Sequence, residues 1–126
     1  MQTSEEELLR ERVNTRCLSL PEAQVERPSG LHSTFLVRGK KFAYYLVDHH
    51  GDGRITVCAR VAPGEQYRLA AEDPGRFFVP SYIGPRGWAG YYLDGADVDW
   101  DVVERLVADS YLMAAPKRLA AQLRRP

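Results

Sequence analysis

The sequence predicts an α+β fold in which helices cover one face of an antiparallel sheet. Short stretches with alternating apolar residues follow one another in the middle of the chain, and helical patterns stand at both ends. No internal repeat or interdomain linker divides the 126 residues. Strands in succession with helices at the ends are typical of an antiparallel sheet covered on one face. We therefore expect a single domain over residues 1–126, with a short basic tail from about residue 117.

Composition supports one stable core and excludes several classes of protein. The hydrophobic fraction is 44% and the charged fraction 27%, which is ordinary for a globular chain. Because 17 Lys and Arg residues balance 17 Asp and Glu residues, electrostatic binding to nucleic acid needs a local patch. No apolar run is long enough to cross a bilayer, and the N-terminus lacks a signal-peptide core. We expect no membrane partner and a cytoplasmic location.

The first helix begins at a capping box and ends before a proline. Ser4 is followed three residues later by Glu7, so each side chain can bond the other residue's backbone N–H. Pro21 ends the helix, because the residue before a proline is disfavoured in the α region. The apolar side chains that recur every four positions on one face are Leu9, Val13 and Cys17.

Three strands are expected next. Residues 34–37 and 41–46 flank Arg38-Gly39-Lys40, whose composition is typical of a hairpin turn. Residues 55–61 alternate between two faces, one with Ile55, Val57, Ala59 and Val61 and the other with Thr56, Cys58 and Arg60. This alternation predicts a strand with one buried face.

The rest of the chain predicts a short helix, two strands and a long helix. The helix runs from Pro63 to Glu72, and the strands cover residues 76–79 and 90–93, with a loop between them. Asp99 is a good N-cap for the last long helix, which ends at about residue 115, before a proline. The stripe expected to pack on the sheet is Val103, Leu106, Val107, Ser110 and Ala114.

Signatures of catalysis and of metal binding are missing. The chain has no G-x-S-x-G elbow, no phosphate-binding G-x-x-x-x-G-K-[ST] loop and no H-E-x-x-H pair. The loop from Asp48 to Gly53 is similar to the start of a calcium loop, but Ala59 stands where that loop needs a bidentate Glu. The two cysteines, Cys17 and Cys58, lie far apart in the sequence. We therefore expect a protein that is not an enzyme and that holds no cofactor or metal.

Cations and aromatic residues are the candidate binding groups. A basic patch is expected at the hairpin turn, and the loop of residues 82–90 places a cation beside an indole. Tyr44-Tyr45 and Tyr91-Tyr92 lie in strands, so one Tyr of each pair must leave the helix-packed face. Cross-strand packing of the tyrosines and a core role for the indole are the alternatives. The candidate residues are Arg38, Lys40, Lys41, Tyr82, Arg86, Trp88 and Tyr91.

Several segments together resemble the MmcQ/YjbR family over roughly residues 4–120. They are Leu18 to Ala23 after the first helix, the hairpin around Arg38-Gly39-Lys40, the loop ending in Trp88, Asp109-Ser110-Tyr111, and Ala115 to Leu119. The resemblance implies a CyaY-like α+β fold and a DNA-binding role, through similarity to double-wing DNA-binding modules. Many relatives have a longer His- and Lys-containing stretch before the tryptophan, where this chain has Arg86 as its only cation. The resemblance therefore carries over Arg86 and Trp88, and more loosely Lys40 and Lys41.

The sequence leaves two functions open. The first is a non-enzymatic DNA-binding protein, accessory or regulatory, that binds weakly and without sequence preference. The alternative is a binder of a small aromatic molecule, with a sequestration or resistance role and an exposed Tyr/Trp surface. Some relatives lie among antibiotic-biosynthesis genes, which keeps this alternative open. In both cases we expect the hairpin turn and the loop of residues 82–90 on the binding side, because loops on a rigid scaffold carry function most often.

Overall fold

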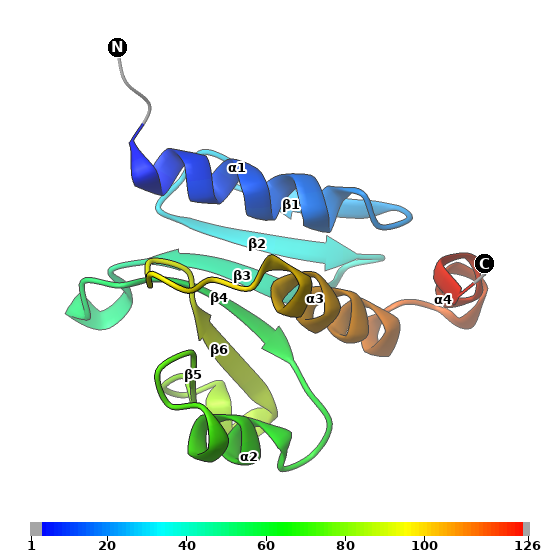
Figure 1. The fold of residues 1–126 in the computed structure, drawn as a ribbon. Helices are drawn as coiled ribbons and strands as arrows, with labels where there is room; N and C mark the ends of the chain where they lie inside the picture. The colour runs from blue at the N-terminus through cyan, green and yellow to red at the C-terminus, as the bar shows by residue number, and fades with distance from the viewer. Residues whose placement is uncertain (1–3, 125–126) are drawn as a thin grey trace.

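A six-stranded antiparallel sheet forms the centre of the computed structural model, which describes residues 4–124 (Figure 1). The spatial order of the strands is β1-β2-β3-β4-β6-β5, and every neighbouring pair is antiparallel. The strands are β1 (Ala23–Glu26), β2 (His32–Val37), β3 (Lys40–Val47), β4 (Ile55–Arg60), β5 (Phe77–Phe78) and β6 (Trp88–Tyr92). Residues 125–126, at the end of the predicted basic tail, lie outside the described part of the chain.

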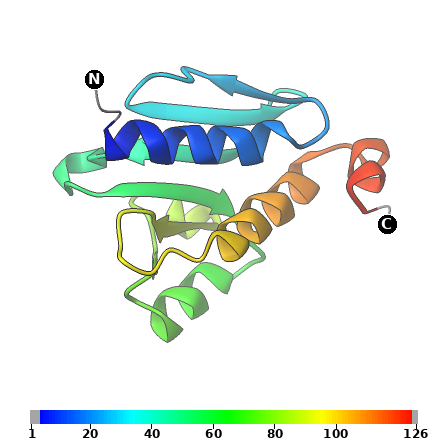
Figure 2. The ribbon, with the colours of Figure 1, turned by 45° about the horizontal axis from the view of Figure 1, so that its top comes forward.

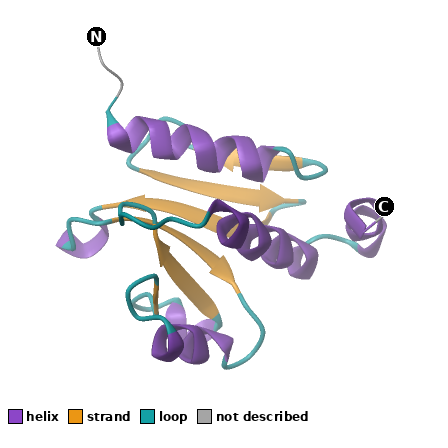
Figure 3. Ribbon diagram, in the orientation of Figure 1, coloured by secondary structure: helices purple, strands orange, loops and turns teal. Residues whose placement is uncertain are grey.

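The four described α-helices contribute to one buried cluster on one face of this sheet (Figures 2 and 3). They are α1 (Glu5–Leu18), α2 (Glu65–Glu72), α3 (Trp100–Ala114) and α4 (Lys117–Arg124). The long helix α1 runs alongside the first strands, and α3 packs on β3 and β4 (Figure 1). The short helix α2 lies beside β5 and β6, and α4 stands at the end of the molecule (Figure 1). The predicted α+β class, with helices on one face, is confirmed.

Both long helices begin at the predicted caps. The Ser4 hydroxyl accepts a hydrogen bond from the Glu7 N–H at 3.2 Å, which satisfies a backbone donor in the first turn. The Asp99 carboxylate accepts from the N–H groups of Asp101 and Val102. Of the predicted α3 stripe, Val103, Leu106, Val107 and Ser110 are buried and Ala114 is half-buried.

Three details of the strands differ from the sequence-based expectation. Strand β1 was not predicted; it pairs with β2 at the edge of the sheet, with Val25 opposite Phe35. Strand β6 begins at Trp88, two residues earlier than expected, because Trp88 pairs with Arg60 on β4. The prediction of one buried face for β4 is wrong, since Thr56 and Cys58 on the other face are buried too.

A small second cluster explains why β4 is buried on both faces. Cys58, Leu46 and Trp88 are buried together on the face away from the helices, which we call the open face. Phe78 and Ile83, from β5 and the segment that follows it, pack against them. These residues partly cover the open face of the sheet. They lie far from β4 in the sequence, so the alternation within β4 does not reveal that its second face is buried.

Candidate functional site

Four cations surround one hollow at the end of the sheet. The hollow has a volume of about 520 Å³ and lies between the β2–β3 turn, the end of β4, the 3₁₀ turn η2 (Gly84–Arg86) and the carboxyl end of α3. Among the described residues, no Asp or Glu lines it. The cations are Lys40, Lys41, Arg60 and Arg86, and the structure records no ion pair for any of them with the described residues. We call this feature the cationic hollow.

The floor of the cationic hollow is aromatic. The rings of Tyr44 and Trp88 lie with their centroids 5.0 Å apart and their planes tilted by 46°. The indole is only 4% exposed, because it packs against Leu46 and Cys58. Trp88 therefore anchors the second cluster, as the alternative interpretation of the sequence had it, and its edge supports the hollow rather than presenting a free ring face.

A β-bulge turns Lys41 toward the hollow. The register between β2 and β3 shifts between Phe35, which pairs with Ala43, and Leu36, which pairs with Lys41, so that Phe42 has no partner on β2. An extra residue in one strand reverses the side-chain alternation beyond it. Phe42 and Ala43 are consequently both buried on the helix side, and Lys41 comes to line the hollow with Tyr44.

Ser110 of α3 secures the backbone on both sides of this bulge. Its hydroxyl donates to the carbonyl oxygen of Phe42 at 2.6 Å and accepts from the N–H of Arg60 at 2.9 Å. Ser110 is fully buried, so water does not reach this point. Without its hydroxyl, the Phe42 carbonyl and the Arg60 N–H would lose a hydrogen-bond partner that water could not replace. One side chain thus holds β3 and β4 where Lys41 and Arg60 leave the sheet.

The segment that carries Arg86 is fixed by hydrogen bonds rather than loose. The buried Gln66 side chain donates to the Gly84 carbonyl at 2.9 Å, and the Val61 N–H donates to the Gly87 carbonyl at 2.8 Å. Gly84 is required here, since a Cβ at this position would lie 2.4 Å from a methyl carbon of Val79. This segment therefore holds Arg86 beside the end of β4.

Arg38, at the tip of the β2–β3 turn, does not line the hollow. Its guanidinium donates two hydrogen bonds to the Glu22 carboxylate, at 2.7 and 3.1 Å. The hydrogen bond from Arg38 lowers the pKa of the Glu22 carboxyl, although both side chains are about half exposed. The charge of Arg38 is already matched inside the molecule, so it is a weaker candidate than the lysines next to it.

The two tyrosines among the candidate residues lie elsewhere. Tyr82 is 78% exposed but does not line the hollow. Tyr91 is fully buried on the helix side, and its hydroxyl accepts a hydrogen bond from the Asp99 N–H at 3.0 Å. The expectation of Tyr91 on an exposed surface is wrong: within its pair, Tyr92 faces away from the helices. Tyr45 is likewise fully buried, which leaves Tyr44 on the open face.

Sequence reasoning missed Arg60 as a site residue. Its position on the more polar face of the alternating stretch 55–61 is a usable signal, because that face carries Cys58 and Arg60 together. The pairing of Arg60 with Trp88 cannot be read from the sequence, because it depends on which strands are neighbours in the sheet. This pairing places the guanidinium carbon 5.5 Å from the centre of the indole ring. Met113 and Ala114 also line the hollow, and only the packing of α3 brings them there.

Comparison with known proteins agrees with this architecture. The YjbR family model matches residues 18–113, which is more than half of the chain. The chain belongs to the YjbR family. A crystal structure of the Deinococcus radiodurans protein DR2400, with domain DUF419, shares the fold with a TM-score of 0.66 at 20% sequence identity. The match covers 90% of this chain and 86% of that one. No curated protein sequence matches significantly.

The two cysteines of this YjbR-family chain are buried free thiols. Burial raises the pKa of the Cys58 thiol to about 12, so the sulfur beneath the hollow is a protonated thiol at neutral pH and a poor nucleophile. Burial likewise raises the pKa of Cys17. Among the described helices, none has the length and apolar character needed to cross a membrane.

Proposed function

We propose that this YjbR-family protein is a non-enzymatic DNA-binding protein whose cationic hollow contacts the phosphate backbone. The observation that carries the proposal is the grouping of Lys40, Lys41, Arg60 and Arg86 around one hollow without a lining carboxylate. Arginine and lysine side chains of this kind supply the sequence-independent part of DNA binding. Unpaired cations favour an anionic partner, since each would gain a charge-assisted hydrogen bond from a phosphate oxygen.

The distribution of charge along α3 favours one orientation of DNA. Its first turn and the preceding residues carry Asp97, Asp99 and Asp101, whereas its other end, roughly 20 Å away, borders the hollow at Met113. The carboxyl end of a helix contributes about half a negative charge, which the four cations outweigh. Phosphates are thus repelled at one end of α3 and attracted at the other, although the net charge of the chain is zero.

The experiment is a titration of a labelled DNA duplex by fluorescence anisotropy at several salt concentrations. Four phosphate contacts give a log–log salt slope of about −3.6, so affinity should fall on the order of 100-fold between about 50 and 200 mM salt. The double variant Lys41→Ala/Arg86→Ala should flatten the slope by about two units.

A matched control removes two cations from the helix side. Arg76→Ala/Arg105→Ala changes the net charge equally but leaves the hollow intact, so the slope should stay close to that of the unmodified protein. Equal effects of the two double variants would mean that overall charge, not the hollow, governs binding. Undetectable binding at low salt would reject the proposal.

A further inference from the structure

A second concavity lies between α2 and α3, on the helix side of the sheet. Its volume is about 650 Å³, within the range of sites that hold small molecules. Arg60 and Met113 border both this groove and the cationic hollow, but the other residues that line the two are different. We call it the α2–α3 groove.

The walls of the α2–α3 groove are mainly apolar. The apolar side chains of α3 that line it follow one another at helical spacing, next to the stripe that packs on the sheet. Leu69 of α2 faces them, and Phe77 of β5 closes the groove below. Met113 is 49% exposed, so part of its side chain is accessible from the groove. The lining residues of α3 in this group are Val102, Leu106, Leu112 and Met113.

The charged rim of the groove has an excess of unpaired arginines. Arg68 is already held by two carboxylates of its own helix, Glu65 and Glu72. Arg105 and Arg60 have no ion pair recorded with the described residues, and they face a single unpaired carboxylate, Asp109. Among the described residues, the apolar walls therefore lie beside two arginines and one carboxylate outside ion pairs, an excess of one positive charge.

We propose that the α2–α3 groove binds a small organic anion with a flat apolar body, of the aromatic carboxylate or sulfonate class. The walls take the apolar body, and Arg105, with Arg60 at the border, binds the acid group through charge-assisted hydrogen bonds. A carboxylate suits the planar guanidinium, which can donate two parallel hydrogen bonds. Arg60 is shared with the cationic hollow, whereas Arg105 and the apolar walls take no part in the DNA-binding proposal.

The test uses 8-anilinonaphthalene-1-sulfonate and, for comparison, the uncharged N-phenyl-1-naphthylamine, both followed by fluorescence on the folded protein. The sulfonate should bind with a dissociation constant on the order of 10–100 µM, and at least about tenfold more tightly than the uncharged probe. Arg105→Ala should remove most of this preference, while Arg105→Lys keeps part of it. The variant Lys41→Ala/Arg86→Ala should leave the affinity for the probe unchanged.

Two measurements locate the probe. Ala62→Trp fills the groove from the loop before α2 and should weaken binding about tenfold or more, whereas Ala71→Trp, outside the groove, should not. Methyl resonances of Val102 and Leu112 should shift on titration even if a Trp variant fails to fold. Equal affinity for both probes overturns the anion preference. Unshifted Val102 and Leu112 methyl groups, or no binding of either probe at millimolar concentration, overturn the site.

Discussion

The two ends of β4 each place an arginine over an aromatic ring of β6, yet the two arrangements differ in what completes them. Arg54, just before β4, lies 3.8 Å from the centre of the Tyr92 ring. Arg60, the last residue of β4, lies 5.5 Å from the centre of the Trp88 ring. Both are cation–π contacts on the open face of the sheet.

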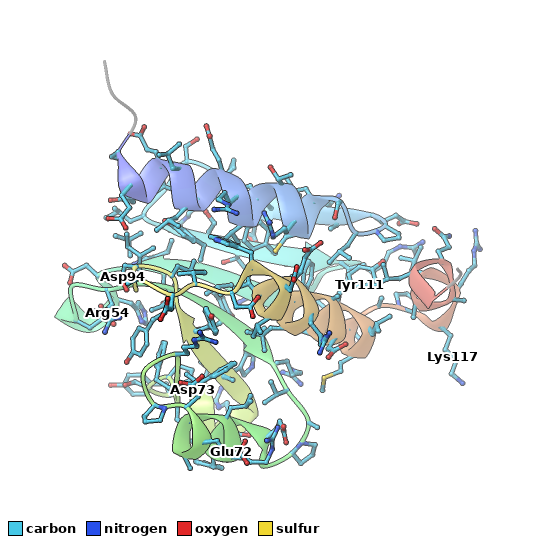
Figure 4. The ribbon with its side chains drawn as sticks, in the orientation of Figure 1. Arg54, Glu72, Asp73, Asp94, Tyr111 and Lys117 are labelled. Carbon is cyan, nitrogen blue, oxygen red and sulfur yellow. The ribbon has the colours of Figure 1, made fainter. Side chains whose placement is uncertain are left out.

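The difference between the ends is a carboxylate. Asp94 accepts hydrogen bonds from the Arg54 side chain and from the Ile55 N–H, and Figure 4 shows the two charged side chains pointing toward one another. In the part of the chain that the structure describes, no carboxylate lines the hollow at the Arg60 end. Where the charge is matched inside the molecule, the contact joins parts of the fold. Where it is unmatched, our proposal is that the same kind of contact leaves a cation available to DNA.

The largest effect expected concerns Trp88. Trp88→Ala should lower the free energy of unfolding by about 3–5 kcal/mol, as truncation of a buried aromatic residue does. The physical reason is the loss of its packing with Tyr44 and with the second cluster. Chemical denaturation measures the change. A loss below about 0.5 kcal/mol, the size of a surface effect, would show that the indole is a free binding platform instead.

Ser110→Ala should have the next largest effect, about 1–3 kcal/mol, because it leaves two buried backbone groups without a partner. The groups are the Phe42 carbonyl and the Arg60 N–H. The Arg60 end should loosen more than the Arg54 end, so amide hydrogen exchange should accelerate at Arg60 and not at Ile55. If the mutation accelerates exchange equally at Arg60 and at Ile55, Ser110 has no special role at the hollow.

Met113→Glu would give the Arg60 end the carboxylate that it lacks. Met113 lines the hollow and is half exposed, so the variant should fold. We expect DNA affinity to fall about tenfold and the salt slope to flatten by about one unit. Met113→Gln is the matched uncharged control and should bind DNA as the unmodified protein does. If the Glu and Gln variants bind equally, the hollow does not contact phosphate.

The smallest effect expected is a pH dependence at the Arg54 end. Burial acts to raise the pKa of Asp94, but hydrogen bonds from Arg54 and the Ile55 N–H outweigh it and lower the pKa below its ordinary value. A carboxyl group with a lowered folded-state pKa stabilises the fold above its unfolded pKa of about 3.9, and the contribution is lost as the pH falls through the folded value. The melting temperature should therefore fall less steeply below about pH 4 in Asp94→Asn and in Arg54→Gln. Curves parallel to that of the unmodified protein would mean that the pair does not contribute.

Sequence patterns predicted the helices and the hairpin because their signals are local. Caps at Ser4 and Asp99, the spacing of the α3 stripe and the composition of the β2–β3 turn each lie within a few residues. Strand β1 was missed because it is only four residues long and follows a proline. Its side chains are half-buried on one side and exposed on the other, so its apolar pattern is weak. Alternation shows that Tyr91 and Tyr92 face opposite ways, but only the helices decide which of the two is buried.

The candidate site was predicted in part. The structure brings Lys40, Lys41, Arg86 and Trp88 together around one hollow, and it leaves out Arg38, Tyr82 and Tyr91. Arg60 joins them through pairing across the sheet, and the bulge at Phe42 turns Lys41 to the same side. The sequence of a single strand shows neither the pairing of Arg60 nor the bulge, because each depends on the partner strand. A contact of Tyr111 is also invisible in the local sequence: its hydroxyl donates to the Pro21 carbonyl at 2.6 Å, which joins segments 90 residues apart.

The most direct test of the contrast between the two ends of β4 is a titration of ¹⁵N-labelled protein with a short DNA duplex at low salt. If the hollow binds DNA, amide shifts and side-chain N–H shifts should concentrate at Lys41, Arg60 and Arg86. The side-chain resonance of Arg54 should stay in place, because Asp94 already pairs with it. Shifts concentrated at Arg54 or on the helix face, with Arg60 and Arg86 unchanged, would contradict the account.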